Sequence, residues 1–104
     1  MVIQLVRYNV RPDKAAEFAT WVQAAIPILL SAPGIVEIQG YRNITGTTQV
    51  TTLYVFNDLA GFAMFRSNDA VDKVTTEAWQ YIENTHTELL GPSTFAPEPL
   101  RPQR

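Results

Sequence analysis

The chain has 104 residues, with 46% hydrophobic and 17% charged side chains and a formal net charge of -2, which suits one folded domain and excludes a disordered chain. The basic residues are scattered and cysteine is absent, which argues against nucleic-acid partners, disulfides and thiolate metal sites. No apolar stretch reaches membrane-spanning length or resembles a signal-peptide core, so we expect a cytoplasmic protein without a membrane partner.

The first part of the chain predicts a strand followed by a long helix. Residues 2–10 (VIQLVRYNV) carry apolar side chains on both alternating faces, which is typical of a strand covered on both sides. Residues 13–31 repeat apolar side chains at intervals of three and four, which is typical of a helix. Pro27 lies inside this helix, so we expect a kink or a break near residues 24–26. Gly34 can take the left-handed conformation that ends a helix.

A hairpin and a short helix follow. Residues 35–42 and 48–56 predict two antiparallel strands, because residues 43–46 (NITG) between them have the chemistry of a turn. Asp58, just after the second of these strands, can cap the short helix.

A second long helix and a short strand are expected next. Residues 70–87 space their apolar side chains as a helix requires, and residues 93–96 are expected to add a fourth strand. The resulting β-α-β-β-α-β order predicts an α+β, ferredoxin-like fold with a four-stranded antiparallel sheet and helices on one face. We assign residues 1–96 to this domain and the proline-rich residues 97–104 to a C-terminal tail.

The predicted sheet has two apolar faces, and one layer of helices covers only one of them. The first predicted strand places Ile3 and Leu5 on one side and Val2 and Val6 on the other. The strand at residues 48–56 alternates in the same way. An uncovered apolar sheet face would be larger than monomers usually tolerate. We therefore expect a homodimer, in which a second copy covers the other face.

Five short stretches at the ends of the predicted elements form a recognisable set. They are Val10-Arg11-Pro12-Asp13-Lys14, Ala32-Pro33-Gly34-Ile35, Phe56-Asn57-Asp58, Phe62-Ala63-Met64-Phe65-Arg66 and Leu90-Gly91-Pro92. Together with the order of elements, they resemble the antibiotic-biosynthesis-monooxygenase-like domains of the dimeric α/β-barrel superfamily over roughly residues 2–96. The resemblance implies a barrel formed by two copies through their sheets. Members of this family include cofactor-independent monooxygenases of polycyclic phenols, haem-degrading monooxygenases and domains without an assigned activity.

The functional residues of both enzyme branches are absent from the corresponding positions. The quinone-forming branch uses an Asn and a Trp on the third strand, a Tyr in the short helix and an Arg in the next helix; here these positions hold Thr52, Phe56, Phe62 and Thr76. The haem-degrading branch uses an Asn on the first strand, a Trp in the short helix and a haem-ligating His in the next; these correspond to Arg7 or Tyr8, Phe65, and Thr75 or Thr76. Because the axial ligand is absent, we expect no haem. We also expect no other cofactor and no metal.

Two residues are candidates for catalysis. His86 is the single histidine, the residue type that ionises nearest neutral pH, and it can act as a general base near the end of the last predicted helix. The alternative is an exposed histidine stabilised by the helix dipole. Arg42 can bind a carboxylate or phenolate if it projects into a pocket, as can Arg7; alternatively, these arginines and Glu37 form ion pairs at the rim of a dimer.

Aromatic side chains are candidates for lining a cavity between the sheet and the helices. The predicted substrate contacts are Tyr8, Tyr54, Phe56, Phe62, Phe65 and Trp79. The alternative is that these side chains pack in the core, with the phenylalanines filling the cavity.

Three functions stay open on the sequence alone. The first is a homodimer that binds a small apolar or aromatic molecule and acts as a cofactor-independent monooxygenase, in which the substrate's own carbanion reduces oxygen. The second is a non-catalytic ligand-binding or stress-associated dimer. The third is another small-molecule conversion, such as isomerisation or decarboxylation. The fold does not choose among them.

Overall fold

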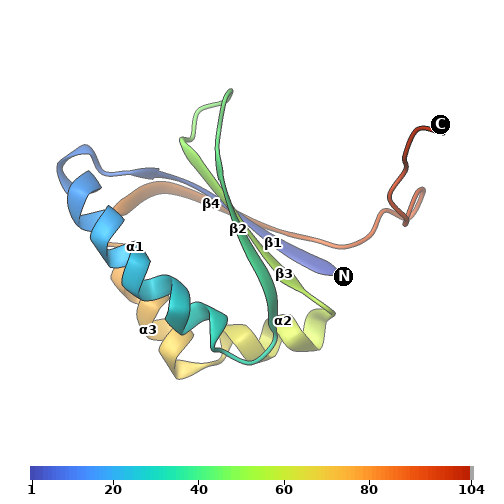
Figure 1. Ribbon diagram of the computed structural model, residues 1–104, viewed down its shortest axis with the longest axis horizontal. Coiled ribbons are helices and arrows are strands. Elements are labelled where there is room, and N and C mark those ends of the chain that lie inside the picture. Colours follow the sequence, from blue (N-terminus) through green and yellow to red (C-terminus); the bar gives the residue numbers. More distant parts are fainter. Residues whose placement is uncertain (104) are drawn as a thin grey trace.

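The computed structural model describes residues 1–103 as one four-stranded sheet with helices on one side (Figure 1). Arg104, the last residue of the predicted tail, lies outside the described residues. The strands are β1 (Val2–Val10), β2 (Ile35–Arg42), β3 (Val50–Phe56) and β4 (Ile82–Leu90). The helices are the short 3-10 helix η1 (Pro12–Lys14) and the α-helices α1 (Ala15–Leu30), α2 (Leu59–Arg66) and α3 (Asp69–Ala78).

The strand order is β2-β3-β1-β4, and each neighbouring pair is antiparallel. The chain crosses from β1 through α1 to β2, and from β3 through α2 and α3 to β4, so β1 and β3 occupy the centre of the sheet. Both crossings pass over the same face, and α1 and α3 lie side by side there (Figure 1). The α+β, ferredoxin-like fold predicted from the sequence is confirmed.

Polar side chains cap the two shorter α-helices. The side chain of Asp58 accepts a hydrogen bond from the backbone N–H of Gly61 at 2.8 Å, at the start of α2. Asn68 accepts hydrogen bonds from the N–H groups of Ala70 and Val71 at 3.0 and 3.2 Å, at the start of α3. These bonds satisfy donors that have no partner inside a helix. The cap at Asn68 therefore separates α2, which ends at Arg66, from α3, which starts at Asp69.

Gly34 ends the turn between α1 and β2 in a conformation that favours glycine. Its φ is +96°, as the predicted helix-ending role requires. A Cβ atom at this position would lie 2.2 Å from the carbonyl oxygen of Gly61 in α2. The turn and α2 can therefore approach this closely only because Gly34 lacks a side chain.

The predicted break at Pro27 does not occur, because α1 continues to Leu30, and a kink there stays a prediction. Proline removes a single hydrogen bond, the one to the carbonyl of Gln23. Gln23 is exposed, so water can satisfy that carbonyl. The hydroxyl and the N–H of Ser31 both donate to the carbonyl of Pro27, at 2.8 and 3.1 Å, which completes the last turn.

The predicted helix at residues 70–87 is wrong in its second half. The helix ends at Ala78, and the chain turns through a hydrogen bond from the N–H of Tyr81 to the carbonyl of Ala78 at 2.9 Å. Residues 82–90 then form β4 along the free edge of β1. This pairing provides hydrogen bonds to backbone N–H and C=O groups of both strands. These hydrogen bonds stabilise the strand more than the spacing of the apolar side chains favours a helix.

The predicted fourth strand at residues 93–96 is also wrong, because these residues have no strand structure. Leu90 already pairs with Ile3, near the start of β1, so little of β1 remains as a partner beyond it. Pro92 has no N–H to donate to a ladder. Residues 91–103 contain no helix or strand and extend away from the sheet (Figure 1). Phe95 in this segment is 98% exposed.

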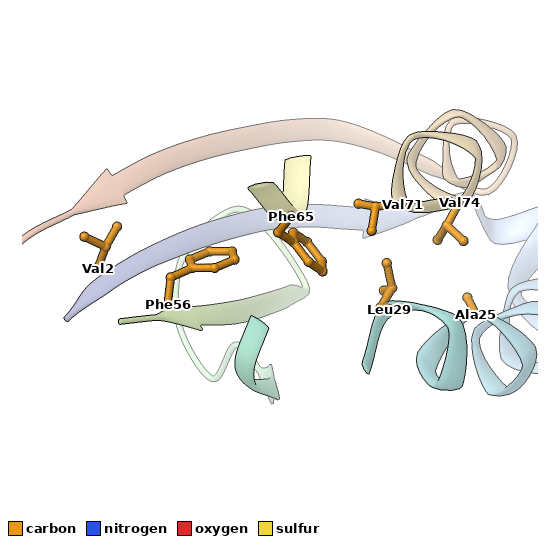
Figure 2. Close-up of a cluster of buried hydrophobic side chains, with 7 residues drawn as sticks. All are labelled: Val2, Ala25, Leu29, Phe56, Phe65, Val71 and Val74. Atoms are coloured by element: carbon orange, nitrogen blue, oxygen red, sulfur yellow. The ribbon is translucent and has the colours of Figure 1, made fainter. Parts of the chain in front are cut away.

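The hydrophobic core occupies part of the space between the sheet and the helices. Phe56 of β3 and Phe65 of α2 are fully buried, with 5.4 Å between their ring centroids. The other buried members of the cluster are Val2, Ala25, Leu29, Val71 and Val74. Figure 2 shows the members from α1 and from α3 pointing toward one another. Each large side chain buried here stabilises the fold by about 1.5–3 kcal/mol relative to exposure.

The other face of the sheet carries no helix among the described residues (Figure 1). The register pairs Ile3 with Val55 and Leu5 with Leu53 on this face, because Val2 and its alternate residues point toward the helices. These four side chains form an apolar centre, and polar side chains such as those of Arg7 and Glu88 lie beside it. The predicted sorting of the apolar residues of β1 and β3 onto two faces is confirmed, but the second face is only partly apolar. A second copy over the open face stays a prediction. Within residues 1–103, no helix has the length and apolar character that crossing a bilayer requires.

Candidate functional site

A cavity of about 480 Å³ lies between the helix-covered face of the sheet and the helices α1 and α3. This volume falls within the range of small-molecule sites. All four strands contribute to one wall, α1 and α3 form the other, and Arg66 reaches in from the end of α2. Most lining side chains are apolar, and those from the helices include Val22, Ala25, Ile26, Leu29, Val74 and Ala78.

Aromatic rings form one end of this cavity. The ring of Trp21 lies 5.2 Å from that of Tyr81 and 5.9 Å from that of Phe18, measured between centroids. Phe18 in turn lies 6.1 Å from Tyr8 in an edge-to-face arrangement. Trp21, Phe18 and Tyr8 line the cavity, and Tyr81 packs against Trp21 and Phe18. Rings arranged in this way suit a flat, apolar ligand.

A second part of the lining is polar and is built around Arg66. Its Nε–H group donates a hydrogen bond to Oε1 of Gln4 at 2.8 Å, and its Nη2 donates to the same oxygen. Its Nη1 donates to the hydroxyl of Thr75 at 3.3 Å. The guanidinium carbon lies 4.8 Å from the ring centroid of Tyr54, in a cation–π contact. Side chains from β1, β3 and α3 therefore hold the guanidinium in place.

Burial decides the protonation states of these groups. It lowers the pKa of Arg66, an effect that Tyr54 opposes, but arginine stays a cation in proteins. Burial raises the pKa of Tyr54 despite the nearby Arg66, and raises the pKa of Tyr8 despite its hydrogen bond to Thr52. Both tyrosine hydroxyls are thus neutral at neutral pH. The cavity combines one cation with neutral hydroxyls, and its described lining contains no acidic side chain.

The edge strand β4 contributes two threonines to the cavity through a β-bulge at Asn84. The pairing of β1 with β4 shifts here, where two residues of β4 oppose one of β1. Asn84 has a φ of +53°, a left-handed conformation that asparagine tolerates better than most residues. Because Asn84 is the extra residue, Thr85 and Thr87 line the cavity and His86 faces the other way. The hydroxyl of Thr85 is buried and has no hydrogen-bond partner among the described residues.

The structure divides the predicted substrate contacts into two groups. Three of them line the cavity: Tyr8, Tyr54 and Trp79. The other three pack in the core instead: Phe56, Phe62 and Phe65. The phenylalanines thus lie beside the cavity and leave it open. A role in substrate binding stays a prediction for each of these residues.

The two predicted catalytic residues do not meet at this cavity. His86 is exposed on β4, with its Nε2 3.1 Å from Oδ1 of Asn84. The interpretation of His86 as stabilised by a helix dipole is wrong, because α3 ends at Ala78. Arg42 is exposed at the end of β2 and does not line the cavity. Their catalytic role stays a prediction that this placement does not support.

Arg7 forms an ion pair with Glu88 at 2.6 Å on the open face of the sheet. The predicted ion pairs of the arginines at the rim of a dimer stay a prediction. Elsewhere in residues 1–103, no three histidine, aspartate or glutamate side chains come together in a way that would hold a metal ion.

Sequence reasoning did not single out Arg66 and Gln4, which form the polar part of the lining. A signal was available for Gln4, because it interrupts an apolar strand at a position that faces the helices. Arg66 ends a helix, where a cation is ordinarily explained by the helix dipole. Its contact with Gln4 depends on how α2 packs against the sheet, which local sequence patterns do not contain.

A comparison of the sequence with known protein families identifies the family of this chain. A family model described as antibiotic biosynthesis monooxygenase matches residues 1–77. This span runs from β1 almost to the end of α3 and includes Gln4, Tyr8, Tyr54 and Arg66. A search among curated proteins finds no match to the chain.

Three solved structures illustrate the shared fold. SnoaB, a cofactor-independent oxygenase from Streptomyces nogalater, has a TM-score of 0.73 at 18% identity, covering 93% of this chain and 97% of SnoaB. A DABB family protein with a ferredoxin-like fold from Mesorhizobium loti has a TM-score of 0.79 at 14% identity, covering 88% of this chain and 96% of the other. Rv0793 from Mycobacterium tuberculosis has a TM-score of 0.72 at 14% identity, with 88% and 94% covered. At these identities, the likeness is one of fold.

Proposed function

Because this chain belongs to the antibiotic biosynthesis monooxygenase family, we propose that its cavity binds a small, flat, mostly apolar aromatic molecule and that the protein oxygenates this molecule without a cofactor. The observation that carries the proposal is the cavity of about 480 Å³, with its apolar and aromatic walls. The shared fold with SnoaB, a cofactor-independent oxygenase, supports it.

The proposed reaction takes its electrons from the substrate. A CH₂ group activated by a neighbouring phenol or carbonyl loses a proton, and the resulting carbanion transfers electrons to O₂. One oxygen atom becomes a new carbonyl oxygen and the other leaves as water. The CH₂ group and O₂ are thereby converted to C=O and H₂O, with the substrate oxidised and oxygen reduced.

The lining residues would bind the substrate, exclude water and stabilise the charge that forms on it. Neutral hydroxyls donate hydrogen bonds to a developing oxyanion, and Tyr8 and Tyr54 supply two of them. The hydroxyl of Tyr8 lies 3.4 Å from that of Thr52, which orients it along the sheet. The apolar walls keep water out and so strengthen these interactions.

A non-catalytic ligand-binding role is the second candidate, and one observation favours it. Among the described residues that line the cavity, none is a histidine, an aspartate or a glutamate. These residue types are the usual general bases. Oxygenation therefore requires a substrate acidic enough to lose its proton without such a base, whereas binding alone has no such requirement.

Gly40 offers a direct test of the cavity. Gly40 of β2 lines the cavity, and a Cβ atom added there would meet nothing within 4 Å. The variant Gly40→Leu should therefore place its side chain in the cavity without disturbing the fold. We expect oxygen uptake with anthrone as substrate, measured without added metal or flavin, to fall at least tenfold in this variant.

The matched control is Gly91→Leu, because a Cβ atom at Gly91 also meets nothing within 4 Å and this residue does not line the cavity. Gly91→Leu should keep the wild-type rate. If wild type takes up oxygen no faster than anthrone alone while it still binds anthrone, the non-catalytic role replaces the oxygenase. If Gly40→Leu binds anthrone as well as wild type does, the cavity is not the site.

We also propose that the protein is a homodimer formed through the open face of its sheet. The side chains of Ile3, Leu5, Leu53 and Val55 lie on that face. A second copy would cover them, as the sequence predicts, and leave both cavities on the outer sides of the paired sheets.

A further inference from the structure

The cavity holds a cation that no acidic side chain neutralises. Ion pairs among residues 1–103 join Arg7 with Glu88, Arg11 with Glu83, and Lys14 with Glu17. Arg66 takes part in none of them, and its hydrogen-bond partners Gln4 and Thr75 are neutral. Arg66 is partly buried, and charged side chains that lose contact with water are normally paired, because an uncompensated charge is costly there. The charge of Arg66 is therefore available to a ligand.

The guanidinium of Arg66 also has N–H groups that a ligand can use. A guanidinium has five N–H groups and no acceptor. Two of them donate to Oε1 of Gln4 and one to Thr75, and the hydroxyl of Tyr54 also interacts with the guanidinium, so at most two N–H groups are left for a ligand. A guanidinium binds a carboxylate or a phenolate through such neighbouring donors.

Gln4 supplies a second donor beside the first. Because Arg66 can only donate, Gln4 must present its carbonyl oxygen to it, and this fixes the orientation of the amide. The NH₂ group of Gln4 then points away from Arg66 and forms no hydrogen bond among the described residues. Gln4 is only 9% exposed and lines the cavity, as Arg66 does. One charged and one neutral donor group thus adjoin the same cavity.

From this arrangement we infer that the ligand of the cavity is an aromatic anion, bound with its carboxylate or phenolate oxygen between Arg66 and Gln4. The inference rests on the proposed function and adds the charge and the orientation of the ligand. The rings of the ligand occupy the apolar remainder of the cavity. Tyr54, beneath the guanidinium, keeps Arg66 directed toward the ligand through its cation–π contact.

Three naphthalene derivatives of similar shape test which ligand charge the cavity prefers. They are 2-naphthoate, the neutral 2-naphthalenemethanol and the cationic 2-naphthylmethylammonium, each titrated into wild-type protein by calorimetry at pH 7. A charge-assisted hydrogen bond is stronger than a neutral one, so we expect 2-naphthoate to bind at least about tenfold more tightly than the alcohol. The ammonium compound should bind most weakly.

A fourth probe, 2-naphthol, distinguishes a phenolate from a carboxylate. Its ionised form absorbs at longer wavelength, so its protonation on the protein can be followed directly. We expect binding to shift its ionisation to lower pH by about one unit, which is about a tenfold preference for the phenolate. Tight binding of 2-naphthoate with no such shift would limit the site to carboxylates.

Variants of Arg66 link the preference to this side chain. In Arg66→Met, 2-naphthoate and the alcohol should bind equally, and the shift of 2-naphthol should disappear, whereas Arg66→Lys should keep part of both. Lys73→Met is the matched control, because Lys73 is an exposed cation of α3 that forms no ion pair among the described residues and does not line the cavity.

The outcomes separate this inference from the function on which it rests. If wild type binds the alcohol as tightly as 2-naphthoate, the cavity binds aromatic molecules but the assignment of an anion is wrong. If a preference for 2-naphthoate survives in a folded Arg66→Met protein, another group recognises the charge and the inference is overturned. If none of the four compounds binds to wild type, the proposed function fails together with the inference.

Discussion

Two tyrosine hydroxyls that line the cavity make the stability of the protein depend on pH in the alkaline range. Burial raises the pKa of Tyr8 and of Tyr54 above the value of 10.0 that an unfolded chain shows. Between the unfolded and the folded pKa, the unfolded chain loses these protons while the folded protein keeps them. The contribution to stability is therefore complete below pH 10 and decreases as pH rises toward the folded pKa values.

We expect the urea concentration at the midpoint of unfolding to decrease between pH 8 and pH 10.5, and to decrease less in the double variant Tyr8→Phe/Tyr54→Phe. The exposed Tyr41 provides the control, since Tyr41→Phe should follow the wild-type pH dependence. An equal decrease in the double variant and in wild type would show that other groups cause the effect.

At the scale of elements, the α1–β2 turn approaches α2 too closely to admit a side chain at Gly34. Gly34 combines a φ of +96° with a position 2.2 Å from a backbone oxygen for any added Cβ. Because the obstructing atom is backbone, it cannot rotate away as a side chain would. The variant Gly34→Ala must therefore move α2, the helix that ends in Arg66.

We expect Gly34→Ala to lower the free energy of unfolding by at least about 3 kcal/mol, from the strained backbone and the overlap together. Gly46 has a similar φ of +98°, but a Cβ atom there meets nothing within 4 Å. Gly46→Ala should thus lose only about 1–2 kcal/mol from backbone strain. Urea denaturation of both variants checks the difference, and equal losses would rule out the overlap as a cause.

The elements show where sequence patterns suffice and where they fail. The strands β1, β2 and β3 and the helices α1 and α2 follow from local periodicity, turn residues and caps, which act over a few residues. The strand β4 does not, because Val71, Val74 and Ala78 begin a helical spacing that residues 81–85 happen to continue. Its real determinant is the unpaired edge of β1, far away in the chain, as the pairing of Arg7 with His86 illustrates.

The candidate site is less predictable than the fold for the same reason. The sequence predicts that Tyr8, Tyr54 and Trp79 line a cavity, because they are aromatic residues on the central strands and near a helix end. Arg66 meets Gln4 across 62 positions of sequence, and the meeting is fixed by how α2 lies on the sheet. Sequence patterns within one element do not predict such a contact.

At the scale of the whole molecule, the proposed homodimer joins two copies through the open face of the sheet. Leu53 lies near its centre, paired with Leu5 of β1 and Gln39 of β2. A carboxylate at this position would be desolvated between two sheets without a cation opposite it. The homodimer should therefore depend on Leu53, while the fold of each copy should depend on it much less.

We expect analytical ultracentrifugation at micromolar concentration to give twice the chain mass of 11.7 kDa for wild type and a single chain mass for Leu53→Glu. Ala24→Glu is the control, because Ala24 is exposed on α1, on the helical side of the molecule. A wild-type protein that sediments as one chain at this concentration would contradict the homodimer.

The bulge in β4 has a consequence for how this scaffold can acquire new chemistry. A strand of the same length without the extra residue would turn Asn84, His86 and Glu88 inward and the two threonines outward. An imidazole and a carboxylate would then replace hydroxyls beside the bound molecule. Whether the cavity contains an imidazole or a carboxylate thus depends on the backbone conformation of Asn84, and we expect a mutation that disfavours this conformation to favour the inward arrangement.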